Sequence, residues 1–104
     1  MVEKLERNGE IAVLYSPGFG AGWSTWGYNH AEAMLFDPEI AEAILAKDSQ
    51  KAKEIFKRKY PEEYDGGLEQ LKVEFVPKGT RFEIKEYDGS ESLHIFGPDE
   101  GYIA

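Results

Sequence analysis

The stretch LKVEFVPKGTRFEIKEYDGSESLHI, residues 71–95, alternates apolar and polar residues and contains two turn signals. The dipeptide Asp88-Gly89 is typical of a two-residue type I′ hairpin, because both central residues of that turn take positive φ. Such a turn places Tyr87 opposite Ser90, and the same register places Ile84 opposite Leu93. The sequence therefore predicts a β-hairpin built from residues 81–87 and 90–96.

The segment PKGT, residues 77–80, predicts a second turn that joins a strand at 70–76 to this hairpin. As a four-residue loop it pairs Phe75 with Phe82. Because side chains alternate between the faces of a strand, the apolar residues of all three strands then lie on one face. That face is formed by Leu71, Val73, Phe75, Phe82, Ile84, Leu93 and Ile95, and the opposite face by Lys72, Glu74, Arg81, Glu83, Lys85 and Ser92. We expect a three-stranded antiparallel meander with one covered face and one face in water.

Two helices are predicted at 37–47 and 49–59, and they are expected to cover the apolar face. Asp37-Pro38-Glu39 combines a preferred N-cap, a proline tolerated at the first helical position and an acid that suits the helix dipole. Asp48 or Ser49 can cap the second helix, which Pro61 ends. The run EIAVLY at 10–15 predicts a further strand of the same sheet, and NHAEAMLF at 29–36 a helical turn. The prediction is a single α+β domain spanning 1–104.

Composition restricts the classes of function. The chain carries 12 basic and 20 acidic residues, a net charge of −8, and has no cysteine. Disulfides and thiolate metal sites are therefore excluded, and free nucleic acid is not favoured as a ligand because binding it needs a basic surface. The N-terminal residues lack the apolar segment of a secretory signal, so we expect a cytoplasmic protein with no membrane partner.

The charges are unevenly placed along the chain. Residues 47–59 hold six bases and two acids, a local net charge of +4, whereas residues 86–104 hold five acids and no base. One hypothesis is therefore an interaction or assembly module that uses the basic helix or the polar sheet face. An exposed edge of the meander also leaves a homo-oligomer open.

The segment SPGFGAGWSTWGYNH, residues 16–30, is the main candidate site, because glycines at alternate positions indicate a shaped loop. Its aromatic rings suit either a stacking surface for a base or partner side chain, or the core of a small domain, and both interpretations stay open. The phosphate-binding glycine motifs are absent, and no lysine or arginine lies between Arg7 and Lys47. The candidate binding residues are Gly18, Phe19, Gly20, Gly22, Trp23, Ser24, Thr25, Trp26, Tyr28 and His30.

The alternative to binding is a small hydrolase that uses His30 or a bound metal. Ser24 lacks the second glycine of a G-x-S-x-G nucleophile turn, although a Ser24–His30–Asp37 arrangement can be drawn. The pair His30-x-Glu32 is a weak metal signal. No catalytic residue, metal or cofactor is assigned.

The hairpin turn is a secondary candidate site, formed by Glu86, Asp88 and Glu91. The predicted register puts Glu86 opposite Glu91, and like charges directly opposite each other are unfavourable. Fraying, a cation or a basic group from another element would relieve this repulsion.

The strings YSPGFGAGWSTW, LFDPEI and VEFVPKGTRFEIKEYDGSES resemble those of a group of small uncharacterised bacteriophage and prophage proteins, from about Ile11 to Leu93. The resemblance implies an accessory protein that acts by binding in the host cytoplasm. Its expected target is a host defence protein, or a small nucleotide signal that the protein sequesters. The resemblance carries no residue roles.

Overall fold

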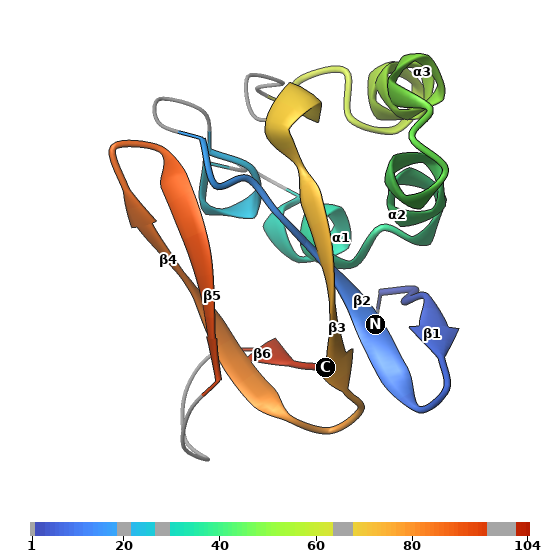
Figure 1. Ribbon diagram of the computed structural model, residues 1–104. Helices are drawn as coiled ribbons and strands as arrows, with labels where there is room; N and C mark the ends of the chain where they lie inside the picture. Colours follow the sequence, from blue (N-terminus) through green and yellow to red (C-terminus); the bar gives the residue numbers. More distant parts are fainter. Residues whose placement is uncertain (1, 19–21, 27–29, 64–67, 96–101) are drawn as a thin grey trace.

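The computed structural model describes residues 2–18, 22–26, 30–63, 68–95 and 102–104. It has an α+β fold, which confirms the predicted class (Figure 1). The elements in chain order are β1 (Glu6–Arg7), β2 (Glu10–Tyr15), the 3₁₀ turn η1 (Ser24–Trp26), α1 (Ala31–Phe36), α2 (Pro38–Leu45), α3 (Ser49–Lys59), the 3₁₀ turn η2 (Leu68–Gln70), β3 (Lys72–Pro77), β4 (Arg81–Tyr87), β5 (Ser90–Ile95) and β6 (Tyr102–Ile103). Among the described helices, none combines the length and the apolar character needed to cross a membrane.

The β4–β5 hairpin has the predicted register. Tyr87 lies opposite Ser90, and Ile84 lies opposite Leu93. Asp88 and Gly89 have φ values of 51° and 83°, as a type I′ turn requires.

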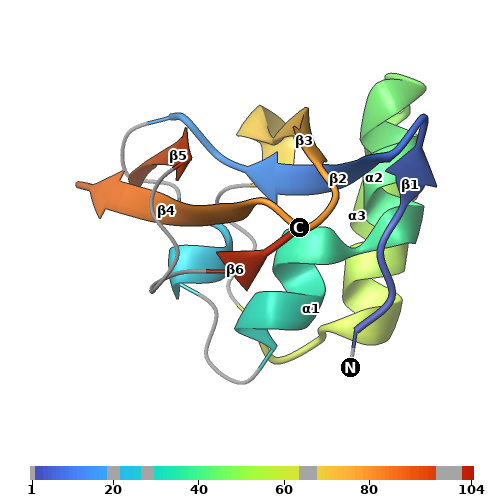
Figure 2. The ribbon, with the colours of Figure 1, turned by 90° about the horizontal axis from the view of Figure 1, so that it is seen from below.

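The predicted pairing of β3 with β4 is wrong. β3 pairs with β2 instead, and the described strands form two antiparallel sheets, β1-β2-β3 and β5-β4-β6. The turn between β3 and β4 is held from both sides, because Lys78 N–H donates to the Gly9 carbonyl and Gly79 N–H donates to the Ala104 carbonyl. β4 therefore leaves β3 at this corner and pairs with β6, and the two sheets diverge from it (Figures 1 and 2). Alternation determines which face a side chain takes, but it does not determine which strand is the neighbour.

The single covered face predicted for the meander is likewise replaced by two cores, one on each side of β2. Ala12 and Leu14 pack in a first core with α2 and α3, whereas Ile11 and Val13 pack in a second core with β4. The helical pair therefore covers the β1-β2-β3 sheet, and β4 and β5 lie on its other side (Figures 1 and 2). The predicted apolar set is divided accordingly: Leu71, Val73 and Phe75 belong to the first core, Phe82, Ile84 and Leu93 to the second, and Ile95 is 57% exposed.

The helix caps follow the sequence prediction. The Asp37 carboxylate accepts hydrogen bonds from the N–H groups of Glu39 and Ile40, and the Asp48 carboxylate accepts one from Lys51 N–H. The helical turn predicted within 29–36 is α1, which contributes residues to both cores. The short strand β1 was missed, although the Asn8-Gly9 turn that precedes β2 is a hairpin signal of the same kind as Asp88-Gly89.

Candidate functional site

The carboxylate of Glu91 joins the two segments that the sequence singles out. Glu91 is 1% exposed, and its carboxylate accepts hydrogen bonds from the backbone N–H groups of Ser16 at 2.9 Å, Trp23 at 2.8 Å and Thr25 at 3.0 Å. The Thr25 hydroxyl donates a fourth. Four donors therefore converge on a single side chain, and hydrogen bonds to a carboxylate are stronger than those between neutral groups. One glutamate of the hairpin therefore holds both arms of the described part of the glycine-rich loop.

Two further hydrogen bonds tie this loop to β5. Glu91 N–H donates to the Ser16 carbonyl at 2.7 Å, and the Ser90 hydroxyl donates to the Pro17 carbonyl at 2.7 Å. We call the described residues 16–18, 22–25 and 86–91 the Glu91 junction. It brings the primary and secondary candidate sites together, although about 65 residues separate them in the chain.

The opposed pair of glutamates is present, as the register predicts. Glu86 is exposed, and its carboxylate accepts a hydrogen bond from Gly89 N–H at 2.7 Å within the turn. Glu91 instead directs its carboxylate to the loop. Backbone amides of another segment therefore stabilise Glu91. This arrangement differs from fraying, a bound cation and a basic group, which are the three explanations that the sequence suggests.

Trp23 is part of the core. Its ring is fully buried, its indole N–H donates to the Met34 carbonyl at 2.9 Å, and its centroid lies 5.4 Å from that of Phe56. The sequence allows either a stacking surface or a core residue here, and Trp23 is a core residue. Its ring therefore offers no surface to a ligand.

The other predicted site residues have different positions. Gly22 and Ser24 are buried and Thr25 is exposed, whereas a methyl group on Gly18 would overlap the side-chain amide of Gln70. Phe19, Gly20 and Tyr28 lie outside the described residues, as does the side chain of Trp26. Because the overlapping atoms are the far end of a flexible, exposed side chain that can move, this contact does not by itself require a glycine at position 18.

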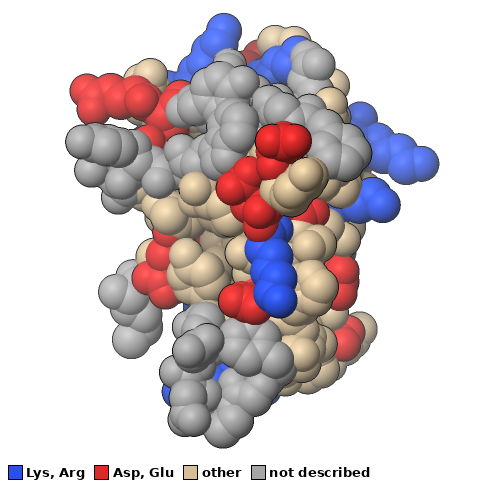
Figure 3. Space-filling model, turned by 90° about the vertical axis from the view of Figure 1, so that its left-hand side faces the viewer, with Lys and Arg blue, Asp and Glu red and all other residues tan. Residues whose placement is uncertain are grey.

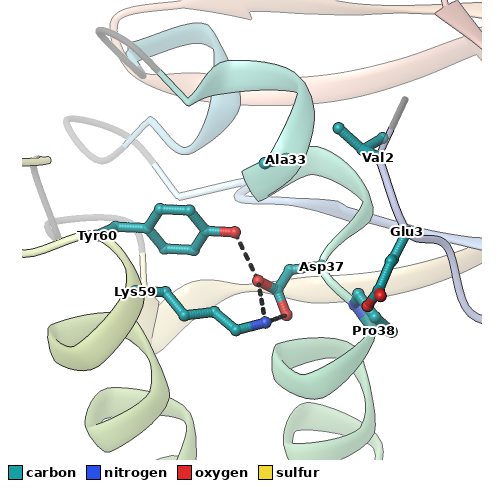
Figure 4. Close-up of a pocket in the computed structure, with 7 residues that line it drawn as sticks. All are labelled: Val2, Glu3, Ala33, Asp37, Pro38, Lys59 and Tyr60. Atoms are coloured by element: carbon teal, nitrogen blue, oxygen red, sulfur yellow. Dashed lines mark hydrogen bonds and ion pairs between the residues drawn. The ribbon is translucent and has the colours of Figure 1, made fainter.

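A second feature is a small cavity of about 180 Å³ beside the start of α2 (Figure 4). Asp37, 1% exposed, accepts a hydrogen bond from the Tyr60 hydroxyl at 2.6 Å and pairs with the Lys59 ammonium at 3.2 Å. Lys59 also pairs with Glu39 at 2.9 Å. The cavity is lined by Val2, Glu3, Ala33, Asp37, Pro38, Lys59 and Tyr60.

The tyrosine and the lysine at this cavity both have a raised pKa, so both keep their protons at neutral pH. Burial, together with the neighbouring Asp37 carboxylate, raises the pKa of the Tyr60 hydroxyl. Burial alone lowers the pKa of Lys59, but its bonds and ion pairs with Glu39 and Asp37 outweigh that effect and raise it. Neither group is suited to act as a base, and the three side chains instead connect the start of α2 to the end of α3.

This arrangement predicts a loss of stability in alkaline solution. Above the ordinary tyrosine pKa of about 10, the unfolded chain releases a proton that folded Tyr60 keeps, so the free energy of unfolding falls as pH rises. We expect the melting temperature to decrease more steeply between pH 9 and 11 in the native chain than in Tyr60→Phe. Equal slopes in the two proteins, measured by circular dichroism, would contradict this assignment.

The residues of the alternative hydrolase are not assembled. The His30 ring lies 3.4 Å from the Glu63 carboxylate and packs on Tyr60, while Asp37 is engaged by Tyr60, Lys59 and the α2 amides. Ser24 is buried. Within the described ranges, no three His, Asp or Glu side chains are grouped so that they could hold a metal.

The basic segment 47–59 and the acidic residues of the β4–β5 hairpin differ in how far ion pairs balance their charges. On the basic helix α3, Arg58 and Lys59 both pair with Glu39, which reduces the net charge of that surface. The side of the molecule formed by β4 and β5 shows acidic side chains gathered near a basic one (Figure 3). Tyr87, 74% exposed, stands on this hairpin between Glu86 and Asp88.

Comparison with family models, with curated proteins and with solved structures finds no match for the chain.

Proposed function

We propose that this chain acts by binding another protein, without catalysis, through the surface at the Glu91 junction. The observation that carries the proposal is the set of hydrogen bonds from Ser16, Trp23 and Thr25 to the buried Glu91 carboxylate. They fix the arms of an aromatic, glycine-rich loop beside an exposed hairpin tip. A loop fixed in advance loses less conformational entropy when it binds.

The same geometry favours a protein over a nucleotide as the partner. The loop amides at Ser16, Trp23 and Thr25 that could receive a phosphate are already bonded to Glu91. No lysine or arginine lies between Arg7 and Lys47 to supply a positive charge, and the Trp23 ring is buried. A nucleotide would therefore find these three amides already occupied, and one of the stacking surfaces that the sequence suggested, the Trp23 ring, is buried.

The contact surface proposed here combines Tyr87 with the aromatic residues of the loop that the sequence assigns, Phe19, Trp26 and Tyr28. Exposed tyrosine and tryptophan side chains contribute most strongly to protein interfaces. Because Glu86 and Asp88 flank Tyr87 and are exposed, the matching surface of the partner is basic. The resemblance to small phage proteins supports a host protein, such as a component of a defence system, as this partner.

The test compares capture of host proteins by the native chain, Trp26→Ala, Tyr87→Ala and the control Lys57→Ala, an exposed position on α3. We expect a host protein that the native chain and the control retain, and that each aromatic variant binds at least tenfold more weakly, about 1.4 kcal/mol. Far-UV circular dichroism should stay native in all four proteins.

Three results would contradict the proposal. A nucleotide released from the purified protein by denaturation would favour the sequestering function. Loss of the partner in Lys57→Ala alone would favour the basic helix as the interface. Unfolding of Trp26→Ala, together with unchanged binding by Tyr87→Ala, would place both rings outside the contact surface.

A further inference from the structure

The outer face of the β4–β5 hairpin brings a serine hydroxyl and a histidine ring together. Because side chains alternate along a strand, Ser92 and His94 share one face of β5, and Leu93 packs on the second core from the other face. Ser92 Oγ lies 2.9 Å from His94 Nε2, and both residues are exposed. When the neutral ring carries its proton on Nδ1, the Ser92 hydroxyl donates to Nε2, so His94 can take the proton of that hydroxyl.

Two charged side chains of β4 lie beside this pair. In the hairpin register Lys85 is directly opposite Ser92, and Glu83 is directly opposite His94. Side chains in opposite positions have Cβ atoms about 4.5–5.5 Å apart, so Lys85 can reach a group attached to Ser92 and Glu83 can reach the His94 ring. The Lys85 ammonium lies 3.6 Å from the Glu83 carboxylate. A hydroxyl, a base, a carboxylate and a cation therefore share one surface.

We infer that Ser92 is a modification site, which accepts an acyl group from an activated ester. Ser92 Oγ attacks the carbonyl carbon of the ester while its proton passes to His94 Nε2. The bond from the carbonyl carbon to the leaving oxygen then breaks, and the leaving group takes the electron pair and receives the proton from His94. The acyl group remains on Ser92 as an ester. The reaction modifies the chain once and requires no turnover, so it is compatible with a protein that acts by binding.

The charges on β4 assist this step. Negative charge develops on the carbonyl oxygen during the attack, and the Lys85 ammonium opposite Ser92 stabilises it. Positive charge develops on the His94 ring as it takes the proton, and the Glu83 carboxylate stabilises that charge. Because the surface is exposed, water weakens both effects. The base therefore supplies most of the acceleration, which for a positioned histidine is about 10²–10⁴-fold.

The other serines of the chain differ from Ser92 in burial or in bonding. Ser16 and Ser24 are buried, and the Ser90 hydroxyl donates to the Pro17 carbonyl. Ser49 is exposed at the first residue of α3. In the part of the chain that the structure describes, a hydrogen bond between serine and histidine side chains is found at Ser92 alone. Ser49 is therefore the control for an exposed hydroxyl of the same chain.

The test exposes the chain to p-nitrophenyl acetate at neutral pH and follows acetylation of each residue over time by peptide mass spectrometry. We expect Ser92 to be acetylated at least about tenfold faster than Ser49. His94→Gln keeps a polar side chain that cannot take the proton, so it should remove this difference and leave acetylation of the lysines unchanged. Glu83→Gln should lower the Ser92 rate, and Glu83→Asp, which keeps the carboxylate, should restore it.

Equal acetylation rates of Ser92 and Ser49 in the native chain would overturn the inference, as would an unchanged Ser92 rate in His94→Gln. Far-UV circular dichroism checks that the variants fold, as is expected for an exposed position such as His94. If His94→Gln fails to fold, the comparison of Ser92 with Ser49 in the native chain decides by itself. The test uses no partner protein, so its result is independent of the proposed binding function.

Discussion

Replacing Glu91 with alanine is expected to lower the free energy of unfolding by about 4 kcal/mol. Three backbone N–H groups and one hydroxyl would lose their common acceptor, and each buried donor left unpaired costs about 1–3 kcal/mol, which water entering the space reduces in part. A domain of this size has a total stability of about 5–15 kcal/mol, so the variant should be close to unfolding at room temperature. Urea denaturation followed by circular dichroism measures the difference.

Glu86→Ala is the matched control, because Glu86 lies opposite Glu91 in the same hairpin but is exposed and accepts a hydrogen bond from Gly89 N–H of its own turn. Its denaturation midpoint should lie close to that of the native chain. Glu91→Gln should fall between the two, since the amide keeps one acceptor oxygen but brings N–H groups toward other donors. Similar midpoints for Glu91→Ala and Glu86→Ala would show that the junction contributes little to the fold.

Trp23→Ala is expected to cost about 3–5 kcal/mol, the range for removing a large aromatic side chain from a core. Trp23→Phe keeps most of the packing and loses the indole hydrogen bond to Met34, so its cost should be about 1–2 kcal/mol. Thermal unfolding of both variants gives the comparison. In a Trp26→Phe background, the fluorescence of Trp23 should be that of a buried indole, and emission typical of a solvated ring would place Trp23 outside the core.

These two predictions concern the residues for which local sequence rules and tertiary structure differ most. Trp23 lies in a glycine-rich loop, where an aromatic residue suits ligand contact as well as core packing. Its burial depends on Phe56 of α3 and on the carbonyl of Met34 in α1, which are distant from it in the chain. No local pattern around Trp23 specifies those two contacts.

The role of Glu91 also depends on residues distant in the chain, but here the sequence does mark the position as unusual. The hairpin register predicts its position opposite Glu86 and thereby marks it as a misfit. A signal for its role was therefore present in the sequence. The backbone donors that resolve the misfit are the N–H groups of Ser16, Trp23 and Thr25, and every residue except proline has such a group, so composition carries no trace of them.

The sequence by itself determined the elements whose causes are local. The Asp88-Gly89 turn set the β4–β5 register, and Asp37 and Asp48 set the starts of α2 and α3, because turn geometry and capping depend on neighbouring residues. Only the tertiary structure decided that β3 pairs with β2, that two cores form on either side of β2, and that Glu91 holds the loop. The physical reason is that a strand with one apolar face, such as β3, can be buried beside more than one neighbour, and the choice depends on the packing of the whole chain.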